Sequence, residues 1–214
     1  MCLILIIIFI TIFFSYKYLG KLGLKLSLIL LTILSFIMSF KIGLFFGIDT
    51  NISVIPYASI FVLLYILIEK YSAQEIKKDI TLTIKTSIFT TLIFLIFISY
   101  TQSVNDQVII NIDHLIKLLP ILSTFIILPL SILLTTKLYK YFNKINENKY
   151  INIIICTIAI ALIESIIQSI LSYFLLLNIN EIMNISLANY LFKIIIIIVS
   201  LPFINLMIKK KVIS

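Results

Sequence analysis

Apolar runs separated by short polar segments follow one another along almost the whole chain. A helix that crosses a bilayer needs about 20 consecutive apolar residues. The pattern predicts about seven such helices, at residues 2–16, 24–47, 52–68, 84–100, 115–136, 151–177 and 188–208. The predicted fold class is therefore all-α: a polytopic helical membrane protein that forms one domain over residues 1–214, with a six-helix core and an additional N-terminal helix.

The polar segments are expected to be loops, chiefly residues 69–79 and 137–150. Positive charge follows the first apolar run instead of preceding it, which favours an uncleaved helix over a signal peptide. Pro120 and Pro129 lie within the fifth run and are expected to bend or break it, because each removes a backbone donor.

Lysines are distributed unevenly between the two sets of alternate loops. Of the 17 basic residues, all of them Lys, 14 fall in loops that would share one side of the membrane. The opposite loops hold only Lys41 and Lys117. Because cytoplasmic loops carry an excess of Lys and Arg, the bias predicts an external N-terminus and a cytoplasmic C-terminus.

Composition agrees with a membrane protein and excludes several other classes. The chain is 62% hydrophobic and its mean hydropathy is +1.22, which is too apolar for a soluble domain of this size. Its pI near 9.4 comes from lysines in short loops, so nucleic acid is not an expected partner. Cys2 and Cys156 have apolar neighbours and no metal-binding spacing.

Known enzyme signatures are missing from the sequence. The one histidine, His114, has no HExxH motif around it, and there is neither a Gly-rich phosphate loop nor any arginine for a phosphate clamp. The sequence therefore predicts a protein that is not an enzyme and has neither a cofactor nor a metal site.

One acid, Glu164, lies near the middle of the sixth apolar run, and Ser165 and Gln168 share its side of a helix. A carboxylate at that depth costs about 2.5–3.5 kcal/mol or more unless it faces a partner or water. The polar side of this helix must then face the other helices. Two interpretations remain: a protonated Glu that ties two helices together, or a ligand or ion site.

Lys193 is a second charge inside an apolar run, and Asn189 precedes it by one helical turn. Opposite charges that pair in the membrane lose most of their burial penalty, so we predict that Lys193 pairs with Glu164. The alternative is that Lys193 extends its long side chain to the outer membrane interface.

Several segments resemble one family in their order and spacing. In the first third these are Gly-Lys-x-Gly-Leu at residues 20–24, SFKIGLFFG at residues 39–47, and Glu69-Lys70-Tyr71 followed by a charged run at residues 75–78. In the last third they are IALIESIIQSI at residues 160–170 and NYLFKIIIIIVSLPF at residues 189–203. Together they resemble the vitamin uptake transporter (VUT) family of queuosine-precursor transporters, over residues 16–78 and about 155–211.

The resemblance implies an uptake transporter for a small planar heterocycle, a 7-deazaguanine precursor of queuosine, in the bacterial cytoplasmic (inner) membrane. Glu164 occupies a position where the family has Asp. Four residues before the position of Glu69 the family has another Asp, and this chain has Tyr65 there. The candidate substrate-binding residues are Glu164, Gln168, Lys193, Asn189, Ser165, Glu69 and Tyr65. The expected partners are this substrate and the lipid bilayer, and assembly into a homo-oligomer is left open.

Two alternatives are also considered. One is the substrate-binding S component of an energy-coupling-factor vitamin importer, which docks its partner through small residues such as Ala-x-x-x-Ala in the first helix. The first run here has no Ala. The other is a structural membrane protein without a ligand, in which replacing Glu164 would affect folding alone.

Overall fold

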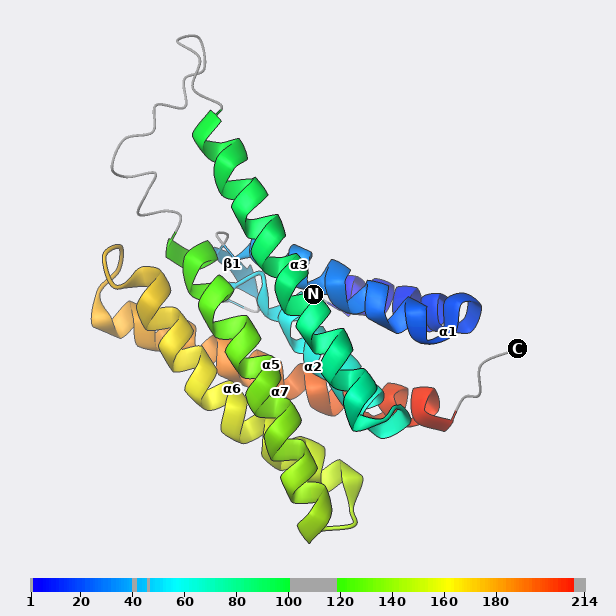
Figure 1. Ribbon diagram of the computed structural model, residues 1–214. Helices are drawn as coiled ribbons and strands as arrows, with labels where there is room; N and C mark the ends of the chain where they lie inside the picture. The colour runs from blue at the N-terminus through cyan, green and yellow to red at the C-terminus, as the bar shows by residue number, and fades with distance from the viewer. Residues whose placement is uncertain (1, 40–41, 46, 101–118, 210–214) are drawn as a thin grey trace.

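The computed structural model describes residues 2–39, 42–45, 47–100 and 119–209, and this part of the chain forms six α-helices and one two-stranded β-hairpin (Figure 1). The expected loop positions Lys41, His114 and Lys117 lie outside the described residues. The helices are α1 (Cys2–Met38), α2 (Val54–Lys70), α3 (Ala73–Tyr100), α5 (Leu119–Ile145), α6 (Lys149–Tyr173) and α7 (Ile179–Lys209).

Four of the described helices, α1, α5, α6 and α7, are long and apolar enough to cross a membrane. The chain is therefore a multi-pass helical membrane protein, as its sequence predicts. These four spans are identified by length and composition among the described residues alone. The count of seven spans and the orientation in the membrane therefore stay predictions.

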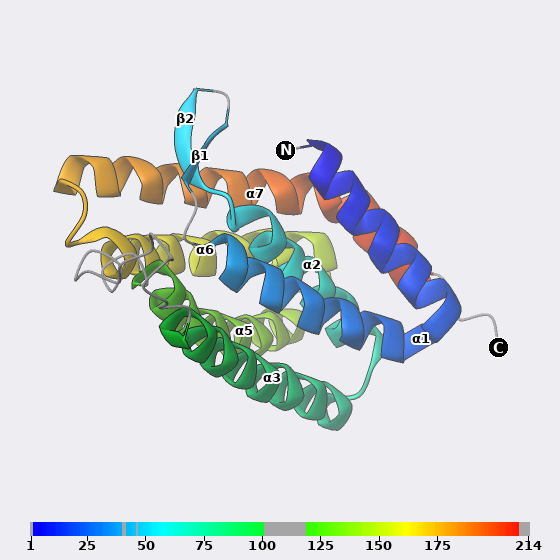
Figure 2. The same ribbon diagram turned by 90° about the horizontal axis from the view of Figure 1, so that it is seen from above.

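Helix α1 contains the first predicted run and the second as far as Met38, with a sharp bend between them. The bend can be followed in Figure 2. At this bend Gly20 has φ 56° and ψ −131°, a conformation that glycine adopts without the steric penalty of a Cβ. The two arms are in close contact beside the bend, since a Cβ added at Gly23 would lie 2.0 Å from the backbone oxygen of Ser15.

The prediction of helix up to residue 47 is wrong, because α1 ends at Met38 and a hairpin follows. Strands β1 (Ile42–Phe45) and β2 (Ile48–Asn51) are antiparallel, with Ile42 opposite Asn51. Glycines at positions 43 and 47 disfavour a helix, and Gly47 has φ 80° at the turn of the hairpin. The apolar residues of β1 continue the apolar run of α1, so the hydropathy pattern alone does not distinguish this strand from helix.

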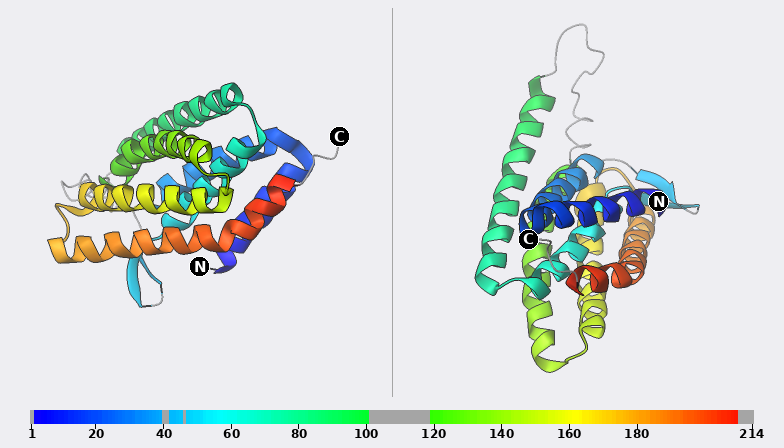
Figure 3. Two further views of the ribbon diagram at one scale, coloured as in Figure 1. Left: turned by 90° about the horizontal axis from the view of Figure 1, so that it is seen from below. Right: turned by 90° about the vertical axis from the view of Figure 1, so that its right-hand side faces the viewer.

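Helix α2 lies at the centre of the bundle and contacts α1, α3, α5 and α7. Every residue from Val54 to Leu67 is buried, as expected of a helix that is apolar on all sides and surrounded by protein. Figures 2 and 3 show α2 between α1 and α7, and α6 beside α7.

Both of the longest predicted loops are partly helical. Helix α3 already begins at Ala73, where Ser72 and Glu75 form a capping box: the Ser72 N–H donates to Glu75 Oε2 (3.1 Å) and the Glu75 N–H donates to Ser72 Oγ (3.4 Å). Helix α5 extends to Ile145, and Asn148 caps α6. Helix α5 begins at Leu119, so Pro120 lies in its first turn, and it continues through Pro129. The expected break therefore does not occur, and the expected bend stays a prediction.

Beside its apolar core the bundle buries many polar side chains, and many large apolar side chains lie exposed on its outside. Leu187 and Val199 are more than half exposed, whereas Thr124 and Thr135 are fully buried. Both threonine hydroxyls donate within their own helix: Thr124 Oγ1 to the Pro120 carbonyl and Thr135 Oγ1 to the Ser131 carbonyl, both at 2.7 Å. This distribution suits a bundle whose outer surface faces lipid.

Candidate functional site

Helix α6 turns one polar face toward the interior of the bundle. Its buried polar residues include Thr157, Glu164, Ser165, Gln168 and Ser172. Glu164, Gln168 and Ser172 follow one another at intervals of four residues, which places them along one side of a helix. Thr157 and Ser165 lie seven residues before Glu164 and Ser172 and share that side. The predicted inward orientation of this face is confirmed.

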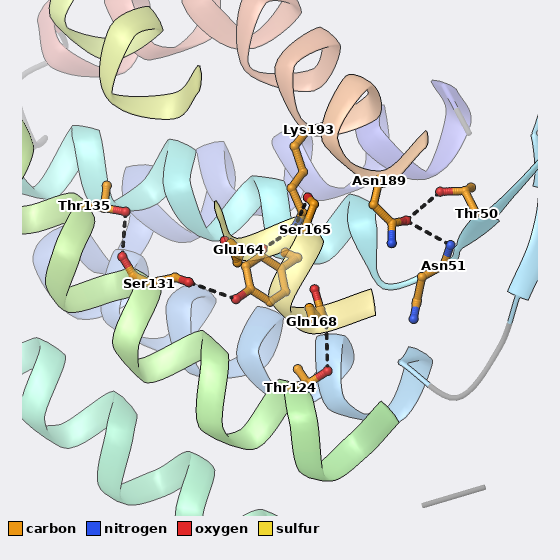
Figure 4. Close-up of polar contacts among 11 residues, drawn as sticks. Thr50, Asn51, Thr124, Ser131, Thr135, Glu164, Ser165, Gln168, Asn189 and Lys193 are labelled. Carbon is orange, nitrogen blue, oxygen red and sulfur yellow. Dashed lines mark hydrogen bonds and ion pairs between the residues drawn. The ribbon is translucent and has the colours of Figure 1, made fainter. Parts of the chain in front are cut away.

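The predicted pairing of the two intramembrane charges is also confirmed. Lys193 Nζ on α7 donates to Glu164 Oε1 on α6, and it lies 3.2 Å from Ser165 Oγ (Figure 4). The Lys193 side chain is only 1% exposed, so it does not reach the membrane interface. Its ammonium also lies 4.6 Å from the centroid of the Tyr57 ring on α2, which places three helices around one cation.

The second carboxylate oxygen of Glu164 has a different environment. Glu164 Oε2 is buried and accepts no hydrogen bond from the described residues. The nearby Tyr57 hydroxyl donates to Ser131 Oγ at 3.5 Å. Because a buried oxygen without a donor is costly, this atom is a strong acceptor for any donor that reaches it.

Asn189 is held by the hairpin. Its Oδ1 accepts from Thr50 Oγ1 (2.7 Å) and from the Asn51 N–H (3.1 Å). Asn51 in turn donates through Nδ2 to the Ser39 carbonyl (2.7 Å) and to the Tyr173 hydroxyl (2.9 Å). The hairpin end is thereby joined to α1, α6 and α7.

Thr50 and Asn51 are site residues that the sequence interpretation missed. Their only signal is a short polar segment, Asp49-Thr50-Asn51, next to an apolar run. That segment looks like an external loop, and nothing local to it indicates a contact with a helix more than 130 residues later.

Gln168 lies one turn after Glu164 and is held by α5. Its Nε2 donates to Thr124 Oγ1 at 3.0 Å. The next turn of α6 makes a similar contact, since the hydroxyls of Ser172 and Ser123 lie 2.6 Å apart. The polar face of α6 is thus bound to both α5 and α7.

A narrow, closed cavity lies between these groups, with no room for even a water molecule in this conformation. Its lining residues are Asn51, Ser53, Val54, Tyr57, Gln168, Asn189 and Lys193. Pockets that hold small ligands usually measure about 300–1,000 Å³. In this conformation the site is therefore closed, with Lys193 on the cavity wall and Glu164 behind it.

Two further candidate residues, Glu69 and Tyr65, belong to a separate cluster. Glu69 Oε1 accepts from the Tyr139 hydroxyl (2.9 Å) and from Asn143 Nδ2 (3.0 Å), and Oε2 pairs with Lys149. The Tyr65 hydroxyl lies 2.9 Å from Thr157 Oγ1, two turns of α6 before Glu164. Neither residue lines the cavity beside Lys193.

The Lys-rich segments of α1 and α3 meet in ion pairs. Lys21 lies 2.9 Å from Glu75, and Lys25 lies 3.4 Å from Asp79. The hydrogen bond from Lys21, together with donation from Ser72, lowers the pKa of Glu75. The α1 bend and the start of α3 therefore share one charged end of the bundle.

Comparison with known proteins identifies one family. The model of a family described as "Putative vitamin uptake transporter" matches residues 51–207, well over half of the chain. The match includes α2, α5, α6 and most of α7, and with them Glu164 and Lys193. The family match does not include residues 16–50, although part of the sequence resemblance to the family lies there. No curated protein and no solved structure matches the chain.

Proposed function

The chain belongs to the vitamin uptake transporter family, and we propose that it imports a 7-deazaguanine precursor of queuosine through the site between α2, α6 and α7. Membership implies a transporter of a small molecule, not an enzyme. The resemblance of the sequence to queuosine-precursor transporters supplies the finer identity of the substrate, and the bacterial cytoplasmic membrane as its location.

The observation that carries the proposal is the buried ion pair of Glu164 and Lys193 beside a closed cavity. Intramembrane charges that face a bundle interior commonly mark substrate or ion pathways. Here the cavity has an aromatic ring, Tyr57, and amide groups on its walls, which suits a flat polar ring.

The chemistry of a 7-deazaguanine ring fits these groups. The exocyclic amine at the guanidine-like edge of this ring is an N–H donor, and a carboxylate accepts strong hydrogen bonds from such a group. Glu164 has one oxygen without a donor and one that pairs with Lys193. We infer that the substrate edge approaches Glu164 as Lys193 moves aside, while Tyr57 contacts the face of the ring.

Transport requires that the closed cavity open to each side in turn. Above the cavity, the hairpin contacts of Asn51 join α1, α6 and α7. At the other end, the contacts of Glu69 join α2, α5 and α6. We propose that these two polar clusters break alternately, so that the substrate enters past the hairpin and leaves past Glu69.

The proposal is tested by uptake of labelled 7-deazaguanine into bacterial cells that lack their own carrier. Cells that produce the chain should accumulate the label above cells with an empty vector, without any added coupling subunit. Accumulation that depends on co-produced energy-coupling subunits would instead support an S component. Failure to accumulate the label in both settings would reject this substrate.

A further inference from the structure

We propose that Asn189 and Gln168 determine substrate specificity by recognising a lactam edge, a ring carbonyl next to a ring N–H. Asn189 would donate to the carbonyl oxygen and Gln168 would accept from the N–H. This inference rests on the proposed function, and it assigns to each amide one fixed hydrogen-bonding role that the transporter family alone does not give.

The orientation of the Asn189 amide follows from its neighbours. The Asn51 backbone N–H can only donate, and it lies 3.1 Å from Asn189 Oδ1. Thr50 Oγ1 is bonded to the same oxygen. The amide must therefore present its oxygen to the hairpin, which leaves the Nδ2 donor on the other side. Figure 4 shows this nitrogen turned away from Thr50 and Asn51.

The Gln168 amide is fixed in the opposite sense. Thr124 Oγ1 has one proton, which it donates to the Pro120 carbonyl at 2.7 Å. Toward Gln168 this hydroxyl can only accept, so the Gln168 NH₂ group must face it, at 3.0 Å. The Gln168 oxygen is turned away from Thr124 (Figure 4). It accepts no hydrogen bond from the described residues.

Both amides line the same narrow cavity, from α7 and α6 respectively, and both are at least nine-tenths buried. Asn189 Nδ2 likewise has no hydrogen-bond partner among the described residues. A site whose walls present one donor and one acceptor in fixed positions discriminates against ligands that leave them unpaired. The matching ligand presents an acceptor to α7 and a donor to α6, as a lactam does.

The test compares uptake of 7-deazaguanine with uptake of its 6-deoxo analogue, 2-amino-7-deazapurine. Removing the oxo group also turns the adjacent ring N–H into an acceptor, so both proposed contacts are lost. The wild-type protein should prefer 7-deazaguanine by about tenfold or more. Asn189→Asp keeps the oxygen that Thr50 and Asn51 require but replaces the free donor with an acceptor, and it should abolish this preference.

A second pair of variants keeps the proposal testable if Asn189→Asp fails to reach the membrane. Gln168→Glu and Gln168→Met both lose the donor to Thr124, but only Gln168→Glu retains an acceptor. Preference for 7-deazaguanine should persist in Gln168→Glu and disappear in Gln168→Met. Membrane abundance is measured for each variant.

The outcomes separate this inference from the proposed function. If the wild-type protein transports both compounds equally, or if Gln168→Glu and Gln168→Met discriminate alike, the lactam assignment is wrong although the transporter stands. If the wild-type protein transports neither compound, the proposed substrate is wrong and the lactam assignment falls with it.

Discussion

Lys193 on α7 pairs with Glu164 on α6, and neither side chain is more than 2% exposed. The pair is central to the bundle because the polar face of α6 meets α7 there and the Tyr57 ring of α2 covers the ammonium. Two charges in such a position stabilise each other, but either one alone would be a buried, uncompensated charge.

Removing one partner should therefore destabilise the protein more than removing both. Lys193→Met leaves the Glu164 carboxylate without its cation, and we expect a loss of about 3–5 kcal/mol of stability. The double variant Glu164→Gln with Lys193→Met should recover much of that loss. Thermal unfolding in detergent measures both. Equal losses in the single and double variants would show that the two charges are not coupled.

The bend of α1 should be sensitive to small side chains. Gly23→Ala places a Cβ 2.0 Å from the Ser15 backbone oxygen, so the two arms of α1 must separate. Gly47→Ala is the matched control, because its added Cβ meets no atom within 4 Å and only the positive φ is penalised, at about 1–2 kcal/mol. We expect the larger drop in Tm for Gly23→Ala. A larger drop for Gly47→Ala would contradict the close contact of the arms.

The charged end of the bundle should weaken in acid. The hydrogen bond from Lys21, followed by donation from Ser72, lowers the pKa of Glu75 in the folded protein. Its ionised form therefore contributes stability above the unfolded pKa of about 4.3, and this contribution is lost as the pH falls through the folded pKa.

The measurement for Glu75 is Tm at pH 7 and at successively lower pH below 4. Glu75→Gln should show a smaller fall in Tm than the wild-type protein, and the exposed Glu147→Gln should behave like wild type. The effect is small because Glu75 is solvent-exposed. Identical curves for Glu75→Gln and wild type would show that the Lys21 contact contributes nothing.

The Glu69 cluster should control access to the bundle from its own end. Glu69→Ala removes the acceptor of Tyr139 and Asn143 and the partner of Lys149, so α2, α5 and α6 should separate more readily there. Buried Cys156, on α6, is a native reporter. In a Cys2→Ser background we expect maleimide labelling of Cys156 to accelerate roughly fivefold or more.

Glu147→Ala serves as the control for that labelling, since it removes an exposed acid near the start of the same helix. An unchanged labelling rate in Glu69→Ala would show that the cluster does not hold this end closed.

The sequence was informative where burial imposes a strict requirement. Glu164 and Lys193 lie in apolar helices, and a charge in lipid needs a partner, so their pairing could be predicted without coordinates. Glu69 and Tyr65 were assigned to the same site by resemblance, but α2 carries them about two to three turns beyond Tyr57, toward the Lys149 end. Depth along a helix depends on tertiary packing, which hydropathy does not encode.

The hairpin could not be predicted for a different reason. Ile42–Phe45 continues the apolar composition of α1, and short apolar strands cannot be distinguished from helix by periodicity alone. The contacts of Thr50 and Asn51 with Asn189 join positions almost 140 residues apart. The orientation of the Asn189 amide, and with it the proposed specificity, depends on those contacts.

The most direct test of the central claim is uptake of labelled 7-deazaguanine by Glu164→Gln beside the wild-type protein and Glu147→Gln, at equal membrane abundance. We expect wild type and Glu147→Gln to accumulate the label and Glu164→Gln to lose uptake, because a neutral amide accepts the substrate amine more weakly and leaves Lys193 without its counter-ion. Uptake by Glu164→Gln at the wild-type rate would contradict a substrate site at the Glu164–Lys193 pair.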